Sequence, residues 1–215
     1  MKKIFLLCLT LFTLFCSTAL AAETAASQEI VLNLPKTSTK QLTAEQRQLL
    51  LPRVAVVYYN NAQTTYNDRI DHFVNEALHE AVADDNYKFL EGTPFFNECR
   101  LAGIEDIGSA EKADLIDILS PYDLDYLIYL EIEPITVRSK ASVFSKGKSA
   151  VITAPLKIID MRNSKTLYNG TLTETGKTTV MMGKIGNKSV ALEGVKRVNE
   201  AMKKIVAERL PKPNL

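Results

Sequence analysis

Histidine and cysteine, which supply many of the nucleophiles, proton carriers and metal ligands of enzymes, are scarce in this sequence. The chain of 215 residues has two histidines and three cysteines. His72 and His79 lie seven residues apart, off the apolar stripe of a predicted helix, whereas two histidines that share a metal on a helix are better placed four apart. We therefore expect both to face solvent, and we predict no catalytic residue, no metal site and no cofactor.

The cysteine pattern also excludes a disulfide-stabilised fold. Cys8 and Cys16 fall in an N-terminal segment that we expect to be removed, so Cys99 stands alone and cannot form an intramolecular disulfide. Because Phe95 and Phe96 are close to it in sequence, we expect Cys99 to be buried rather than reactive.

Residues 1–21 have the pattern of a secretory signal peptide. Lys2 and Lys3 precede the apolar run 4–15, and Ala19-Leu20-Ala21 is a small-x-small cleavage site, so we expect cleavage between Ala21 and Ala22. An uncleaved membrane anchor and a lipoprotein acylated at Cys16 are the alternatives. The pattern predicts export to the periplasm or cell envelope, with a soluble protein after cleavage.

The remaining chain has no strong charge bias and no second long hydrophobic run. The signal peptide holds two of the 26 basic residues and none of the 25 acidic ones, which leaves 24 basic against 25 acidic side chains, a net charge of −1. This balance gives no reason to expect binding to nucleic acid. No other segment approaches the length of a membrane span.

The organisation of the chain predicts one domain. Residues 22–52 form a polar, flexible lead-in that contains a short helix, 44–50, after a capping box between Thr43 and Gln46. A single α/β domain follows over 53–210, and 211–215 is a tail. The segment 125–135 is apolar on both faces before it alternates, which is typical of an interior strand.

Hydrophobic periodicity predicts the other elements around that strand. We expect 95–108 to be irregular, and Pro155 to mark a bulge or an edge position. The fold class is therefore α/β, a mixed β-sheet of about five strands with amphipathic helices packed on it. The predicted strands are 53–60, 87–90, 150–161 and 166–175, and the predicted helices are 68–83, 109–119 and 189–210.

A basic, serine-rich span, 136–149, contains no acidic residue. It carries Arg138, Lys140, Lys146 and Lys148. One interpretation is a solvated hairpin loop. The other is a contact surface for an anionic partner, such as lipid head groups or a cell-wall polymer. Gly147-Lys148-Ser149 looks like the end of a phosphate-binding loop, but the first glycine of that motif is replaced by Ser142.

Three stretches of sequence resemble one group of envelope proteins: RVAVVYYNN, LSPYDLDYLIYLEIEPI and LKIIDMRNSKTLYNGTLTET. Over about 53–210 the chain resembles the CsgG, TolB N-terminal and LpoB type of domain, in which an aspartate-tyrosine strand precedes a hairpin. Asp125-Tyr126 and Ile159-Asp160 match that pattern, whereas Asn163-Ser164-Lys165 replaces its threonine-glycine-lysine turn. The resemblance implies an exported, non-enzymatic adaptor that acts through protein contacts in envelope assembly, secretion or regulation.

Two hypotheses for the function follow. The first is a cell-envelope protein whose partner is another envelope protein or a second copy of itself. The second is a periplasmic domain that binds a small ligand, with a pocket near the aromatic cluster of Tyr58, Tyr59, Phe95 and Phe96. A hydrolase of unfamiliar type ranks below both.

Overall fold

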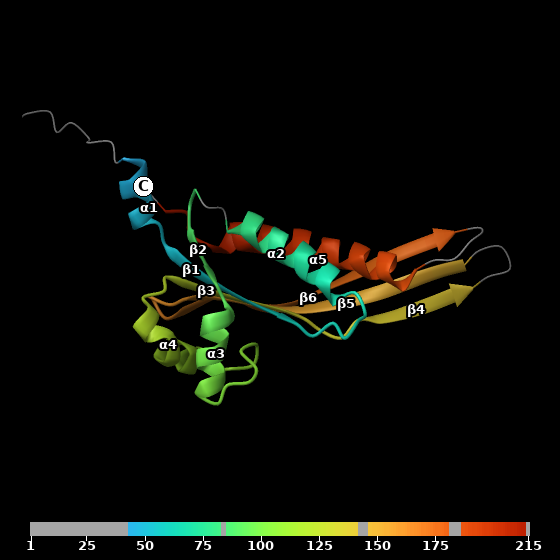
Figure 1. Cartoon of the computed structure of the whole chain (residues 1–215), viewed down its shortest axis with the longest axis horizontal. Helices are drawn as coiled ribbons and strands as arrows, with labels where there is room; N and C mark the ends of the chain where they lie inside the picture. Colours follow the sequence, from blue (N-terminus) through green and yellow to red (C-terminus); the bar gives the residue numbers. More distant parts are fainter. Residues whose placement is uncertain (1–42, 83–84, 142–145, 181–185, 214–215) are drawn as a thin grey trace, which may run out of the picture. The chain divides into compact units, whose positions relative to one another are not determined.

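The strand at the centre of the fold is β3 (Tyr126–Ile132), which lies between β1 and β5 in a mixed six-stranded sheet (Figure 1). The computed structural model describes residues 43–82, 85–141, 146–180 and 186–213. These belong to one compact unit, 42–215. The predicted signal peptide, the lead-in up to residue 42 and the last two residues of the tail lie outside the described part.

The chain enters the sheet from helix α1 (Ala44–Leu50), whose predicted capping box between Thr43 and Gln46 is present. Strand β1 (Arg53–Asn60) pairs in parallel with both β2 (Lys88–Glu91) and β3. Strand β5 (Lys146–Asp160) pairs antiparallel on one side with β3 and then with β4 (Thr136–Ala141). On its other side β5 pairs along its whole length with β6 (Lys165–Val180).

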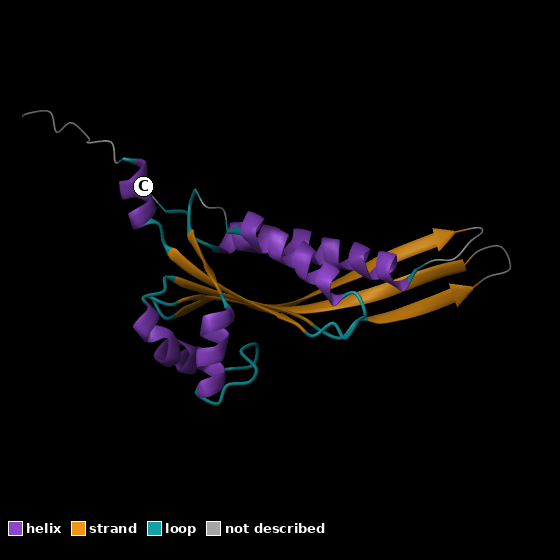
Figure 2. Ribbon diagram, in the orientation of Figure 1, coloured by secondary structure: helices purple, strands orange, loops and turns teal. Residues whose placement is uncertain are grey.

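Helices cover both faces of the sheet at the end that carries β1 and β3. Helices α2 (Asn67–Ala81) and α5 (Asn187–Arg209) lie on one face, and α3 (Thr93–Leu101) and α4 (Lys112–Leu119) lie on the other (Figure 2). Side chains of β3 alternate between the two, because Ile128 and Leu130 join the core under α2 and α5, whereas Leu127 and Tyr129 join the core under α3 and α4. The mixed sheet with packed helices that the sequence predicts is confirmed.

Strands β4, β5 and β6 form a ribbon that extends beyond α3 and α4 (Figure 1). On the face under α5, Ala150, Ile152 and Ala154 are completely buried. On the opposite face the layer that contains α3 and α4 covers only the end of β5, where Lys157 and Ile159 are buried, and Val151 is 43% exposed. We call this uncovered surface of β4, β5 and β6 the open face of the ribbon.

Several predicted elements were wrong. The segment 95–108 is not wholly irregular, since α3 begins at Thr93 with a proline in its first turn, a position that costs a helix no hydrogen bond. Helix α4 begins at Lys112 with Glu111 as its N-cap rather than at Ser109. The basic span is not one loop, because 136–141 is β4 and β5 already begins at Lys146.

Pro155 lies neither at an edge nor at the irregularity in β5, which falls at Ile158/Ile159. It sits opposite Thr171 of β6, in the interval between the β5 residues that pair with β4 (146–151) and those that pair with β3 (156–160). A residue without an N–H fits this interval because no ladder hydrogen bond to β3 or β4 is required there.

Candidate functional site

The ribbon separates the basic residues that the sequence brings together. Arg138 and Lys140 of β4 pair with Ser149 and Gly147 of β5, and both basic side chains are exposed. Lys148 pairs with Ser139, one residue out of step with these pairs, so its side chain projects from the opposite face of the sheet. There its Nζ donates a hydrogen bond to Asn187 Oδ1 at the start of α5. The predicted contact therefore cannot use these residues as one surface.

The side chain of Lys146 and the segment 142–145, which belong to the same predicted contact, lie outside what the structure describes. Within the basic span, Arg138 and Lys140 are therefore the residues that share one described, exposed surface.

The sheet register adds a third cation to the open face, Lys177 of β6. Ser149 pairs with Arg138 on one side and with Lys177 on the other, so the three residues form one cross-strand row. The sequence gives a partial signal for this residue, because 175–192 contains three lysines and no acidic residue. Only the pairing of β6 with β5 places Lys177 beside Arg138.

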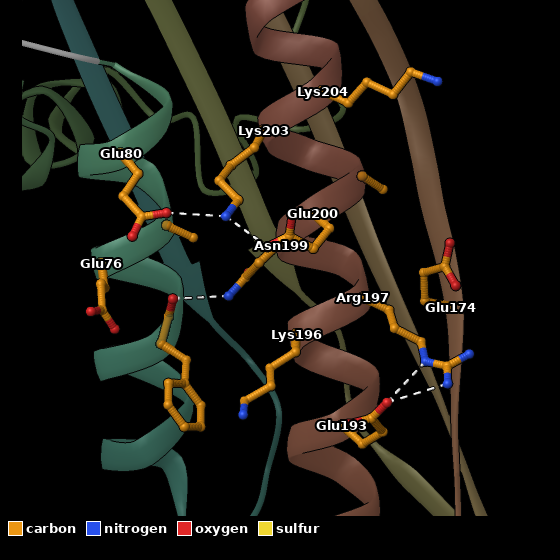
Figure 3. A pocket seen from close by; sticks show the side chains of 13 residues that line it. Glu76, Glu80, Glu174, Glu193, Lys196, Arg197, Asn199, Glu200, Lys203 and Lys204 are labelled. Carbon is orange, nitrogen blue, oxygen red and sulfur yellow. Dashed lines mark hydrogen bonds and ion pairs between the residues drawn. The ribbon is translucent and has the colours of Figure 1, made fainter.

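The second charged surface is a groove of about 940 Å³ along the outer sides of α2 and α5 (Figure 3). Five of its nine charged side chains are paired with one another: Glu80, Glu193, Arg197, Glu200 and Lys203. Lys203 Nζ lies 3.0 Å from Glu80 Oε2 of α2 and 2.6 Å from Glu200 Oε1, and these contacts, Glu200 first, raise the pKa of Lys203. Exposed pairs of this kind contribute little to stability, so the groove resembles a solvated helix surface more than a binding pocket.

A hydrogen bond below these ion pairs joins the two helices. The nearly buried Asn199 of α5 donates from Nδ2 to the carbonyl oxygen of Phe73 of α2 at 2.9 Å (Figure 3). This contact fixes α2 against α5.

The aromatic residues proposed as a ligand pocket do not all come together. Tyr58 packs on the α2 side of the sheet, where its hydroxyl donates to Asp71 Oδ1 at 3.1 Å. On the other side, Tyr59 stacks on Phe96 at 5.8 Å between ring centroids, and Phe95 packs edge-on against Tyr122. The sheet thus separates Tyr58 from the other members of the predicted cluster.

The two histidines and the cysteine have surroundings that are typical of residues with a structural role. His72 and His79 are both exposed, as predicted, and His79 stacks on Phe89. Cys99 is completely buried, also as predicted, and burial raises the pKa of its thiol. Among the described residues, no three His, Cys, Asp or Glu side chains are grouped closely enough to hold a metal ion.

The aspartates near β3 hold strand ends together. Asp125 is 8% exposed and accepts a hydrogen bond of 2.7 Å from the backbone N–H of Arg53, and it also pairs with Arg162. These contacts join the start of β1 to the segment that follows β5, which explains the buried carboxylate without a metal.

In the described part of the chain, none of the helices combines the length and apolarity that a membrane span requires.

Comparisons with known proteins gave no match in sequence to a family model or to a curated protein. Among solved structures, the hypothetical protein CT253 of Chlamydia trachomatis is similar, with 12% identity, coverage of 74% of this chain and 99% of that one, and a TM-score of 0.43. The C-terminal domain of LpoB from Salmonella enterica is similar, with 10% identity and a TM-score of 0.32. The match covers 57% of this chain and 81% of the LpoB chain. TolB from Acinetobacter baumannii is similar, with 8% identity and a TM-score of 0.34, and the match covers 74% of this chain and 28% of the TolB chain.

LpoB and TolB, which the sequence resembles, are therefore also among the structural neighbours of this chain, whereas the resemblance to CsgG stays a prediction. Similarities at these low scores assign no function to this protein.

Proposed function

We propose that this protein is an exported, non-enzymatic component of the cell envelope that acts by contact with another protein, and that a strand of the partner adds to the free edge of β6. The pattern of a signal peptide at residues 1–21 supports export. The single observation that carries the contact is the length of that edge.

Strand β6 has 16 residues and pairs with β5 alone among the described strands. Its second side is therefore a row of backbone groups without a strand partner in the described structure. Natural proteins shield such edges with charges, bulges or short strands. Between Thr166 and Val180 only Glu174 and Lys177 are charged, so this long edge is lightly shielded.

The ladder shows which amides of β6 point outward. The carbonyl oxygen of Thr153 in β5 accepts a hydrogen bond from Glu133 N at 3.0 Å, so the backbone polar groups of Thr153 point away from β6. Thr173 is the register partner of Thr153, and its N–H therefore points to the free edge. The same alternation gives Thr171, Thr175 and Lys177 outward amides.

An added strand would pair with these amides, the mode in which main-chain hydrogen bonds supply affinity and alternate side chains supply specificity. The partner strand belongs either to another envelope protein or to a second copy of this chain.

Thr173→Pro tests the proposal because it removes one outward N–H and no hydrogen bond to β5. A photoreactive residue at Thr171 in the full chain, activated in living cells, should give a discrete crosslinked product, and Thr173→Pro should reduce its yield severalfold. Thr173→Ala retains the N–H and serves as the matched control. A photoreactive residue at His72, which is exposed on α2, controls for random collisions.

Mass spectrometry of the product distinguishes a second copy from another protein. Equal yields from Thr173→Pro and Thr173→Ala, or equal labelling from positions 171 and 72, would contradict strand addition at β6.

A further inference from the structure

We propose that the open face of the ribbon binds the surface of a membrane that contains anionic phospholipids, through a patch made of Arg138, Lys140 and Lys177. We call these three residues the cation patch. The inference does not depend on strand addition, because the side chains of the patch project from a face of the sheet and not from its edge.

The sheet register fixes the geometry of the cation patch. Arg138 and Lys177 flank Ser149 in one row, so their backbones are two strand spacings apart, roughly 10 Å. Lys140 lies two residues beyond Arg138, roughly 7 Å along β4, in the row that contains Gly147 and Thr179. Three exposed cations therefore surround a hydroxyl and a glycine, with no bulky side chain at the centre.

The two rows of the cation patch and the row next to them contain no negatively charged residue. The adjacent row is Thr136, Val151 and Thr175. The sequences 134–159 and 175–192, which supply this end of the ribbon, contain no acidic residue at all. None of the ion pairs found among the described residues involves the cation patch.

The nearest carboxylate of β6, Glu174, pairs with Ile152 and so projects from the other face of the ribbon. The rows that hold and adjoin the cation patch therefore carry positive charge only, and Glu133, which is opposite Thr153, lies beyond them. This local positive charge complements an anionic surface.

The character of the face favours a membrane surface over other anionic partners. Protein-binding hot spots are enriched in tryptophan, tyrosine and arginine. In the three rows, Val151 is the only large apolar side chain and no aromatic residue occurs. An open sheet surface with rows of threonine can approach a planar array of phosphates, and each basic residue near such a surface strengthens binding roughly fivefold.

Three cations should therefore give binding that is weak, reversible and sensitive to salt, since exposed charges are screened over about 10 Å at 0.1 M ionic strength. The test uses the chain without its predicted signal peptide, residues 22–215, in sedimentation with lipid vesicles at low and at physiological ionic strength. One set of vesicles is phosphatidylcholine alone, and the other is equal parts phosphatidylcholine and phosphatidylglycerol.

The test variant combines Arg138→Gln, Lys140→Gln and Lys177→Gln. The control variant combines Lys196→Gln, Arg197→Gln and Lys204→Gln, which removes one arginine and two lysines from α5 on the other face of the sheet. Net charge changes equally in the two variants. Circular dichroism and melting temperature check that both variants are folded. If a triple variant does not fold, the single substitutions Arg138→Gln and Lys177→Gln still test the proposal.

We expect the unsubstituted protein to bind only the anionic vesicles. The test variant should bind the anionic vesicles on the order of a hundredfold more weakly, and each single variant roughly fivefold more weakly. The affinity of the control variant should change by less than that of a single variant. Three outcomes would overturn the proposal: no binding to anionic vesicles at low salt, equal losses in both triple variants, or binding to soluble inorganic polyphosphate as tight as to the vesicles, which would indicate a free polyanion as the ligand.

Discussion

Lys157 is a charged residue used as a structural anchor. It is 6% exposed on the α3 side of β5, and its Nζ donates to the carbonyl oxygens of Ile107 at 3.1 Å and Ala110 at 2.9 Å. These two bonds hold the segment between α3 and α4 against the sheet. Periodicity cannot identify such a lysine, because in the alternation of β5 it occupies a position that a polar surface residue would also occupy.

Burial lowers the pKa of Lys157 from its ordinary value of 10.5, and the nearby Asp106 only partly opposes this shift. The native state therefore releases this proton at a lower pH than the unfolded chain does. Between the two pKa values the unfolded state binds more protons, so the contribution of Lys157 to the free energy of unfolding rises with pH in that window.

We expect the free energy of unfolding of the wild type, minus that of Lys157→Met, to increase from neutral pH towards about 10. Urea denaturation at a series of pH values measures this difference, in which the titration of the tyrosines largely cancels. A difference that is flat or falls with pH would show that Lys157 is not destabilised by burial.

At the scale of elements, α5 touches the ribbon through two glycines. A Cβ added to Gly176 of β6 would lie 2.0 Å from the carbonyl oxygen of Val190 and 2.6 Å from the backbone nitrogen of Gly194. A Cβ on Gly194 would in turn lie 2.5 Å from Cγ1 of Ile152. The backbones of helix and strand are therefore in direct contact, and only glycine fits at this crossing.

Gly176→Ala should destabilise the fold by about 1–3 kcal/mol, because the obstacle is backbone that cannot rotate away. Gly147→Ala is the matched control in the same ribbon, since a Cβ there would meet nothing closer than Thr179 Oγ1 at 3.5 Å. Chemical denaturation of both variants gives the comparison. Equal stabilities would mean that α5 can move off the ribbon at no cost.

Long periodic elements were the part of the fold that the sequence predicted well. The apolar stripe of α2 and the doubly buried β3 are confirmed within a few residues, because their own side chains determine which faces are buried. Helix α3 was missed because Gly92-Thr93-Pro94 is typical of a turn, and because only Phe95 and Cys99 of the helix are buried.

The end of β6 and the position of Lys177 beside Arg138 could not be predicted, for a different reason. The sequence predicts a strand that ends just before Gly176, but Gly176 is the crossing point under α5, and β6 continues to Val180. Which residues share a row depends on the register between strands that are distant in sequence. Lys177 therefore could not be placed beside Arg138 by periodicity alone.

At the scale of the whole molecule, we expect residues 1–21 to determine where in the cell the protein is located. Processing between Ala21 and Ala22 should give an exported protein with the mass of residues 22–215, measured by intact mass spectrometry of the envelope fraction. Cys16→Ser should leave this mass unchanged, whereas Ala21→Tyr should block processing, because the site requires a small residue. An exported protein that begins at an acylated Cys16 would contradict cleavage at this site.

In the described part of the chain the sheet divides the interior into two unequal cores, with 25 buried hydrophobic residues on the side of α2 and α5 and 12 on the side of α3 and α4. The smaller layer is built mainly from one continuous stretch, 93–119, inserted between β2 and β3. We expect such a layer to open as a unit while the larger core stays folded, at a lower free energy than global unfolding. Cys99 lies inside it, so the rate at which an alkylating reagent reaches this thiol would report how often the molecule opens on that side.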